Sequence, residues 1–280
     1  MELLNKEQYH KAAEALKEVS FNHLFANAVV EQKIAGLIYT DNSDFPSSFY
    51  ILHPYGMSLL NGNCNNEDFN KQLAEYLLNK GNLRNRAEWM QVYPEDWNTQ
   101  LSTLLGNQLL TKKQKNEGGF TETDLVKVDE QTRVNFKFEA NKYADFRSNQ
   151  SAGQFEIIRT GEEEFRNMPG TVVPKFFWQS ASQFLNEGIG FSLRFNGELA
   201  CTAFSAFIND RQLELGIESA SQFRGKGFAM HTCAALIDYC LENRLEPVWS
   251  CRLENTASYL LAQKLGFDPV SYHPFYKVNI

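Results

Sequence analysis

A short, positively charged segment with two glycines, residues 222–229, is the part of the sequence best suited to chemistry. Gly225 and Gly227 permit positive φ and let a ligand approach the backbone closely. Successive N–H groups in such a turn converge on an anion, and the N-terminus of a following helix adds partial positive charge. Because Arg224 and Lys226 add charge at the same place, the segment predicts a cradle for a pyrophosphate group.

Known phosphate motifs do not account for this segment, and most Gly-Lys-Gly turns before a helix are only turns. Met230 occupies the third glycine position of the dinucleotide fingerprint, and the chain contains no Walker A motif. The elements expected around the segment are more informative. A strand over 213–219 precedes it and an amphipathic helix over 228–243 follows it. A strand over 247–251 and a helix over 256–265 come next.

In this order of elements the chain resembles the GNAT superfamily of acyl-CoA-dependent N-acyltransferases. The family motif Q/R-x-x-G-x-G/A at the start of the central helix is matched by Gln222, Gly225 and Gly227. A later helix that is led by asparagine and ends in Lys-Leu-Gly-Phe is matched by Asn255 and residues 264–267.

The resemblance covers about residues 133–280 and implies both a fold and a co-substrate. Residues 177–191 also look like a two-domain bacterial branch of the superfamily. The fold would be α/β (α+β), with a mixed central sheet that splays between strands 213–219 and 247–251. Acetyl-CoA would place its pantetheine in that gap and its pyrophosphate on the loop amides, and no metal is implied. The residues expected to bind this coenzyme A group are Ile217, Ser219, Gln222, Phe223, Arg224, Gly225, Lys226, Gly227, Phe228, Ala229, Asn255 and Ser258.

Two carboxylates, Glu214 and Glu218, are candidates for the base that removes a proton from an attacking amine. An amine with a pKa of about 10 is mostly protonated at neutral pH and must lose that proton before it attacks. The two residues are four apart on an expected strand and share one face, with Gly216 between them leaving room. Glu218 is the preferred candidate. For Glu218, an ion pair or exposure to solvent would explain the carboxylate as well as a role as base does. For Glu214, either of these would explain it better than a role as base.

The acid that would protonate the departing thiolate is not evident from the sequence. Many GNAT enzymes use a tyrosine seven residues after the helix-leading asparagine, and Ala262 stands at that position. Tyr259 lies nearly one turn earlier, about 300° around the helix axis, and approximates the place without matching it. Water, Ser258 or the low intrinsic pKa of a thiol could suffice.

The N-terminal half lacks the phosphate-loop motif. Its expected order is αββαβα, with helices over 6–19, 68–79 and 96–110 and strands over 35–40, 48–60 and 88–93. The charged segment 112–119 predicts a linker. This gives an N-terminal α/β domain over 1–120 and a GNAT acetyltransferase domain over 131–280. The former would be a degenerate GNAT-like unit that covers the acceptor site or dimerises, or an unrelated small α/β domain.

Composition argues against several classes of protein. The net charge of −7 disfavours a general nucleic-acid binder. The five cysteines form no C-x-x-C pair and are expected to be reduced thiols in a cytoplasmic protein. The five histidines lack ligand spacing, so no metal site is expected. Neither a signal peptide nor an apolar run of about 18 residues is present, so no membrane association is expected.

The sequence therefore predicts an N-acetyltransferase that moves an acetyl or other acyl group from acetyl-CoA to a primary amine. The amine, expected to belong to a small molecule, would attack directly in a ternary complex. The alternative is a non-catalytic regulatory protein that binds acyl-CoA, which the absence of tyrosine at Ala262 favours. A transferase of aminoacyl groups from tRNA is a third hypothesis, and the acidic net charge counts against it. The chain could also form a homodimer.

Overall fold

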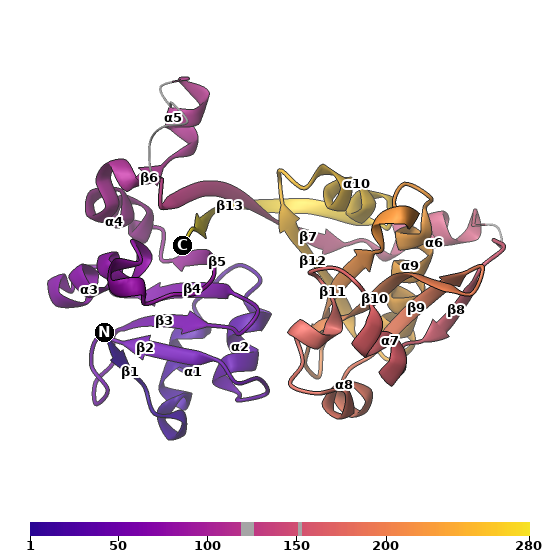
Figure 1. The fold of residues 1–280 in the computed structure, drawn as a ribbon, viewed down its shortest axis with the longest axis horizontal. Coiled ribbons are helices and arrows are strands. Elements are labelled where there is room, and N and C mark those ends of the chain that lie inside the picture. Colours follow the sequence, from indigo (N-terminus) through magenta and orange to yellow (C-terminus); the bar gives the residue numbers. More distant parts are fainter. Residues whose placement is uncertain (119–125, 151–152) are drawn as a thin grey trace. The chain divides into compact units, whose positions relative to one another are not determined.

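The computed structural model describes residues 1–118, 126–150 and 153–280 (Figure 1). These residues divide into two compact units, which are treated separately below. The N-terminal unit contains Met1–Arg133, Arg252–Glu254 and Tyr272–Ile280, and the C-terminal unit contains Val134–Cys251 and Asn255–Ser271.

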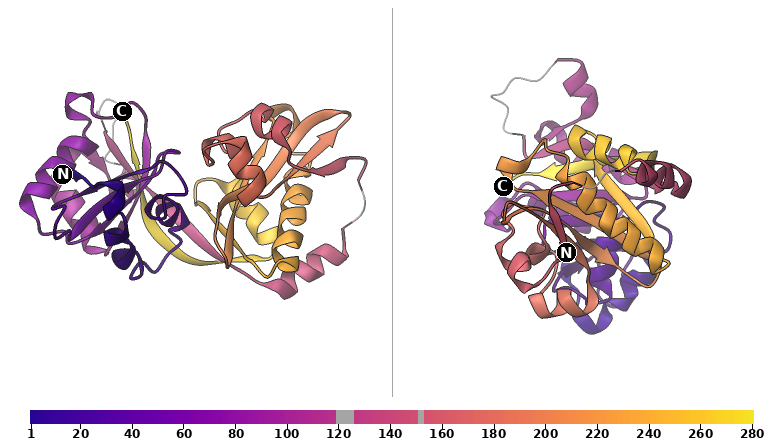
Figure 2. Two further views of the ribbon diagram at one scale, coloured as in Figure 1. Left: turned by 90° about the horizontal axis from the view of Figure 1, so that it is seen from below. Right: turned by 90° about the vertical axis from the view of Figure 1, so that its right-hand side faces the viewer.

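The C-terminal unit is a mixed sheet with helices on its faces (Figures 1 and 2). Its strands follow the spatial order β13-β7-β12-β11-β10-β9-β8. The bounds are β7 (Val128–Phe138), β8 (Glu156–Arg159), β9 (Gly190–Phe195), β10 (Glu198–Ile208), β11 (Gln212–Ser219), β12 (Glu246–Arg252) and β13 (Phe267–Val278). Strands β8, β9, β10 and β11 pair with one another in antiparallel fashion, whereas β11 and β12 are parallel. Strands β7 and β13 contribute residues to both units.

Helices connect and cover these strands. They are α6 (Ala140–Ser148), α7 (Glu162–Asn167), α8 (Ala181–Glu187), α9 (Phe228–Glu242) and α10 (Thr256–Lys264), with short 3₁₀ helices η4 (Pro174–Phe176) and η5 (Ser221–Phe223). Helix α9 is the crossover between the parallel strands. It packs its buried residues, Leu236 and Ile237 among them, against Leu213 and Leu215 of β11. Asn196 and Gly197 form the tight turn between β9 and β10, and both have the positive φ that such a two-residue hairpin turn requires.

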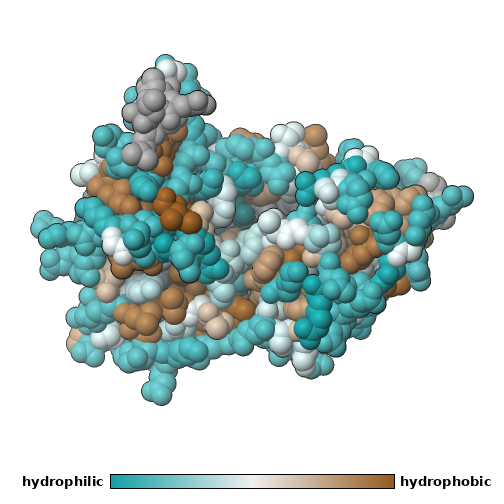
Figure 3. Space-filling model, in the orientation of Figure 1, coloured by the Kyte–Doolittle hydropathy of each residue, from teal (hydrophilic) through white to brown (hydrophobic). Residues whose placement is uncertain are grey.

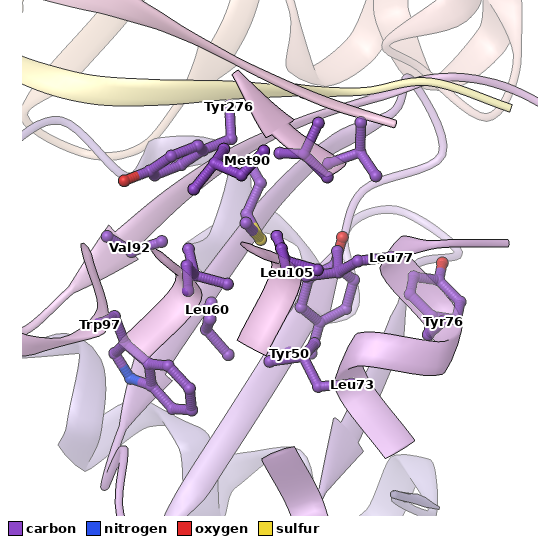
Figure 4. Close-up of a cluster of buried hydrophobic side chains, with 14 of the residues drawn as sticks. Tyr50, Leu60, Leu73, Tyr76, Leu77, Met90, Val92, Trp97, Leu105 and Tyr276 are labelled. Carbon is purple, nitrogen blue, oxygen red and sulfur yellow. The ribbon is translucent and has the colours of Figure 1, made fainter. Parts of the chain in front are cut away.

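The N-terminal unit is also a mixed sheet, in the order β1-β2-β3-β4-β5-β13. Its elements are β1 (Glu2–Leu3), η1 (Lys6–Gln8), α1 (His10–Leu16), α2 (Leu24–Val30), β2 (Leu37–Thr40), β3 (Ser48–Leu52), β4 (Met57–Gly62), α3 (Glu67–Leu77), η2 (Lys80–Asn82), β5 (Glu88–Tyr93), α4 (Asp96–Leu105), η3 (Gly106–Gln108), β6 (Leu109–Leu110) and α5 (Lys112–Asn116). Its core gathers large side chains between the sheet and helices α3 and α4, including Trp97, Tyr50 and Met90 (Figure 4).

The two units repeat one order of elements. In the N-terminal unit, β1-α1-α2-β2-β3-β4-α3-β5-α4 is built from antiparallel strands followed by the parallel pair β4 and β5. In the C-terminal unit, β8-α7-α8-β9-β10-β11-α9-β12-α10 has the same orientations, with β11 and β12 as the parallel pair.

Hydrophilic residues cover most of the face seen in Figure 3.

The structure corrects several expected elements. Residues 48–60 form the hairpin β3–β4 rather than one interrupted strand, because the chain reverses between His53 and Gly56. Helices α2 and α6 were not expected from the sequence. The predicted linker contains the short helix α5, whose N-terminus is closed by a capping box of Thr111 and Gln114. Gly119, the last residue of that linker, lies outside the described residues.

Candidate active site

The parallel strands β11 and β12 are paired only over their first residues. Their register runs from Gln212 opposite Glu246 to Glu214 opposite Val248 and then stops. Strand β11 continues to Ser219, paired on its other side with β10 as far as Cys201. The edge of β11 that faces β12 therefore has no strand partner beyond Glu214 in the described part of the chain. This opening is the splay that the sequence analysis predicted.

A loop of backbone amides follows the open end of β11. Gly225 and Gly227 have φ of 78° and 80°, and no atom lies within 4 Å of the position of an added Cβ at either. Among the described residues, no acceptor receives the backbone N–H groups of residues 225–229. Those groups lie at the N-terminus of α9, a helix of 15 residues. The predicted anion cradle thus has its donors available.

Only some side chains of this loop could meet a ligand. Phe223 and Phe228 are buried in a small apolar cluster, so these two residues offer the ligand backbone only. Gln222, Arg224 and Lys226 are exposed. The Lys226 ammonium lies 5.1 Å from the centre of the Phe223 ring, which holds it beside the loop. The cradle therefore combines free amides with exposed cations.

Glu218 is held by an unexpected set of donors. Its Oε2 accepts hydrogen bonds from the backbone N–H groups of Thr171 and Val172, at 3.0 and 3.1 Å. Its Oε1 accepts one from Nη2 of Arg224 at 3.0 Å. Gly170 allows this close approach, because an added Cβ there would lie 2.5 Å from the carboxyl carbon of Glu218. Residues 170–172 were not among the site residues expected from the sequence.

Glu214 and Glu218 are not joined by open space. The ring of Phe204 on the neighbouring strand β10 fills the position above Gly216, where an added Cβ would lie 2.5 Å from it. The expectation that Gly216 leaves room between the carboxylates is therefore wrong, because a glycine on a buried strand creates a gap that a neighbouring side chain occupies. Glu214 itself is buried on the paired part of β11.

Other predicted residues have structural partners. Ser219 donates its hydroxyl hydrogen to Sγ of Cys201 at 3.3 Å, and burial raises the pKa of that thiol to about 11. Ile217 is half-buried, and Ala229 lies half-buried at the start of α9. Asn255 caps α10 by accepting from the Ser258 N–H at 3.2 Å. These contacts order the elements that border the splay.

The position of the usual tyrosine acid lies in the core. Ala262 is fully buried among the residues that pack α10 against the sheet. Tyr259 is half-buried, with its ring 5.3 Å from that of Phe136 in an edge-on arrangement. Ser258 accepts a hydrogen bond from Nε1 of Trp249 at 3.2 Å. A larger side chain at 262 would therefore displace core residues rather than enter the splay.

The equivalent place in the N-terminal unit is closed. Strands β4 and β5 stay paired from Met57 opposite Trp89 to Asn61 opposite Tyr93. In the turn that follows, the N–H of Asn63 is bonded to the Ser47 carbonyl at 2.8 Å. An added Cβ at Gly62 would lie 2.2 Å from that same carbonyl oxygen. This unit therefore lacks the open strand edge of the C-terminal unit, and the first amide of its turn is bonded within the unit.

A splayed parallel pair with a glycine loop at the N-terminus of its crossover helix is the arrangement that the resemblance to acyl-CoA-dependent acyltransferases implied. Residues 14–276 match the family model described as GNAT acetyltransferase. The chain therefore belongs to the GNAT acetyltransferase family, and the predicted fold class is confirmed.

Individual relatives agree with this assignment. The chain is 24% identical over 255 residues to the uncharacterized N-acetyltransferase YdfB of Bacillus subtilis (strain 168), covering 90% of this chain and 89% of that protein. The GCN5-related N-acetyltransferase-like protein from Streptococcus suis 89/1591 superposes with a TM-score of 0.70 at 19% identity, over 97% of this chain and 98% of that one. A tandem GNAT protein from the clavulanic acid biosynthesis pathway superposes with a TM-score of 0.60 at 8% identity, over 99% and 98%.

The described residues contain neither a membrane-spanning helix nor a cluster of metal ligands. No helix among them is long and apolar enough to cross a bilayer. No cluster of three or more His, Cys, Asp or Glu side chains in that part of the chain could hold a metal ion. All five cysteines are buried, and none of them is in a disulfide.

Proposed function

We propose that this GNAT protein transfers an acetyl group from acetyl-CoA to the primary amine of a small molecule, by direct attack in a ternary complex. The observation that carries the proposal is the set of free amides of residues 225–229, at a helix N-terminus and beside the open edge of β11. Free amides at such a place suit a pyrophosphate, and an unpaired strand edge suits the amides of pantetheine.

The proposed chemistry needs few groups. A backbone N–H on the open edge of β11 would polarise the thioester carbonyl and stabilise the oxyanion formed by amine attack. The new C–N bond forms, the C–S bond breaks, and coenzyme A leaves as its thiolate. A thiolate is a good leaving group because an unperturbed thiol has a pKa of about 8.5, so water could supply the proton. The sequence predicts Glu218, and Glu214 after it, as acceptors of the amine proton. The three hydrogen bonds that Glu218 already accepts favour a positioning role for it instead, which leaves Glu214 or water as the acceptor.

A non-catalytic protein that binds acyl-CoA is the second candidate. The burial of Ala262, where many GNAT enzymes carry a tyrosine, favours it. Release of free thiol from acetyl-CoA with a panel of amines separates the two candidates, because a binding protein would release none. The cytoplasmic setting and the homodimer stay predictions.

The N-terminal unit belongs to the proposal as a GNAT-like repeat without a cofactor site. Its element order matches that of the C-terminal unit, and its parallel pair β4 and β5 is closed. The likeness along the whole chain to a protein described as a tandem GNAT supports this assignment. In this proposal the site lies in the domain predicted over 131–280.

Glycine replacement in the loop tests the cofactor site. Acetyl-CoA at 100 times its Kd should stabilise the parent protein by about 2.7 kcal/mol, because it binds only the native state. Gly225→Val or Gly227→Val should abolish the resulting rise in Tm by blocking backbone approach. Gly81→Val is a matched control, since its φ of 71° is similar and its surroundings are equally open, yet it lies in η2 of the N-terminal unit. Equal Tm shifts in all three variants would contradict the cradle.

A further inference from the structure

Residues 168–173, between α7 and η4, form a loop fixed at both ends. Met168 and Val173 are fully buried, while Gly170 and Thr171 between them are exposed. Within this loop, Thr171 and Val172 direct their N–H groups at a single carboxylate oxygen of Glu218. The loop is therefore held against the end of β11 by one side chain that lies 46 residues or more further along the chain.

The other oxygen of Glu218 is bonded to the cofactor loop. Arg224 donates to it through Nη2, and donates through Nε to the Ser219 carbonyl at 3.2 Å. The Arg224 side chain is 64% exposed, whereas that of Glu218 is 10% exposed. Glu218 thus lies between two loops, one of which belongs to the proposed coenzyme A cradle, and each of its oxygens already accepts from a donor.

We propose that Glu218 is a positioning residue, which holds loop 168–173 beside the splay and couples it through Arg224 to the cofactor loop. This inference rests on the proposed function and deepens it. A carboxylate whose oxygens already receive three hydrogen bonds is well placed to anchor a loop and poorly placed to accept a further proton directly. The exposed backbone of the loop then forms a wall of the site for the amine, and coenzyme A binding at Arg224 tightens that wall.

Conservative and non-conservative replacements separate this role from that of a base. In Glu218→Gln, the amide oxygen can still accept from Thr171 and Val172, whereas Glu218→Ala loses both bonds. We expect the amine KM to rise about 10- to 100-fold in Glu218→Ala, as befits two lost charge-assisted hydrogen bonds, and less than about fivefold in Glu218→Gln. A base would make both variants equally slow.

The pH dependence provides a second distinction. An anchoring role predicts that Glu218→Ala lowers kcat/KM by the same factor at every pH. Loss of a base predicts instead a fall of about 10²–10⁴-fold that shrinks as pH approaches the pKa of the amine. Glu162→Gln is the control, because Glu162 is an exposed carboxylate that is paired with Arg166 one turn later in the same helix, α7. It should leave both KM and the profile unchanged.

Hydrogen exchange tests the anchor without any turnover. The amides of Thr171 and Val172 should exchange slowly in the parent and in Glu218→Gln, and at least about tenfold faster in Glu218→Ala. Gly170→Ala should reproduce the fast exchange, because its φ of 126° and the contact of its new Cβ with Glu218 both disfavour the present conformation. Coenzyme A should slow these amides further in the parent and not in Arg224→Gln.

Failure of the positioning role and failure of the proposed function would give different experimental results. Unchanged exchange at Thr171 and Val172 in Glu218→Ala, in a variant that keeps its far-UV spectrum and coenzyme A affinity, would overturn the positioning role. Equal turnover of Glu218→Gln and Glu218→Ala with a pH-dependent loss would also overturn it, in favour of a base. Failure of the parent to bind acetyl-CoA would instead remove the proposed function and leave the exchange result standing.

Discussion

Ala262 shows at the residue scale how burial limits the chemistry of a site. A tyrosine here could be imagined to supply the missing acid, but the position is fully buried beside Leu265 and Phe267. We expect Ala262→Tyr to lower the free energy of unfolding by about 1–3 kcal/mol through overpacking, and to give no gain in kcat. Urea denaturation and thiol-release kinetics measure the two quantities.

Leu260→Tyr is the matched control for this prediction. Leu260 lies on the same helix, and half of its surface is exposed, so a tyrosine there should leave stability within about 0.5 kcal/mol of the parent. A stable Ala262→Tyr protein with faster turnover would contradict the assignment, because it would place that side chain in the splay.

Single residues also show which parts of the site could be predicted from the sequence and which could not. The cradle at residues 222–229 was predictable because its requirements are local: glycines with positive φ, cations and a following helix. The partners of Glu218 were not predictable, since Thr171 and Val172 reach it through backbone N–H groups, which every residue but proline has. Pro169 and Gly170 indicate a turn, but only tertiary packing determines which carboxylate it meets.

At the element scale, the β3–β4 hairpin contains a histidine that should make the N-terminal unit sensitive to acid. His53 is fully buried, and its Nδ1 accepts a hydrogen bond from the Tyr55 N–H at 3.0 Å. Burial, aided by the charge of Arg86, lowers its pKa to about 3. Because the unfolded chain binds this proton near pH 6.5 and the native state does not, His53 destabilises the fold as pH falls from 6.5 towards 3.

This predicts a measurable slope. The free energy of unfolding of the parent should fall by up to about 1.4 kcal/mol for each pH unit below 6 from this residue alone. His53→Asn, which can accept the Tyr55 bond without titrating, should flatten the slope by that amount between pH 6 and 4. His10→Asn, an exposed histidine in α1, should leave the slope unchanged. Parallel slopes in the parent and His53→Asn would contradict the prediction.

The two helices that were not expected from the sequence, α2 and α6, both lack a clear alternation of apolar and polar residues at the helical period. Helix α2 is buried over five of its seven residues and therefore lacks a polar face to mark a helical period. Helix α6 has the opposite composition, with Tyr143 alone buried, and is fixed by bonds from that hydroxyl to Asp238 and the Ala234 carbonyl. Helix α9, with its long apolar stripe, was predictable almost to the residue.

The whole molecule consists of two units with one element order and different central strands. In the C-terminal unit β11 leaves β12 after Glu214, whereas in the N-terminal unit β4 stays with β5 to Asn61. The turn after β4 also uses its own donors, since the N–H groups of Asn63 and Asn65 are bonded within the unit. A repeated fold therefore does not imply a repeated site.

This difference predicts the binding stoichiometry. Isothermal titration of the full chain with acetyl-CoA should give one site per chain, because among the described residues β11 leaves β12 after Glu214, whereas β4 and β5 stay paired to Asn61. Gly227→Val should reduce that number to zero, and hydrogen exchange should show protection at 215–219 and 225–229 but none at 57–66. Two sites per chain, or binding that survives in Gly227→Val, would mean that the N-terminal unit opens β4 from β5 in solution. The pairing of those strands through Asn61 and the bonded turn that follows make such opening costly, so a single site is the outcome that the backbone arrangement supports.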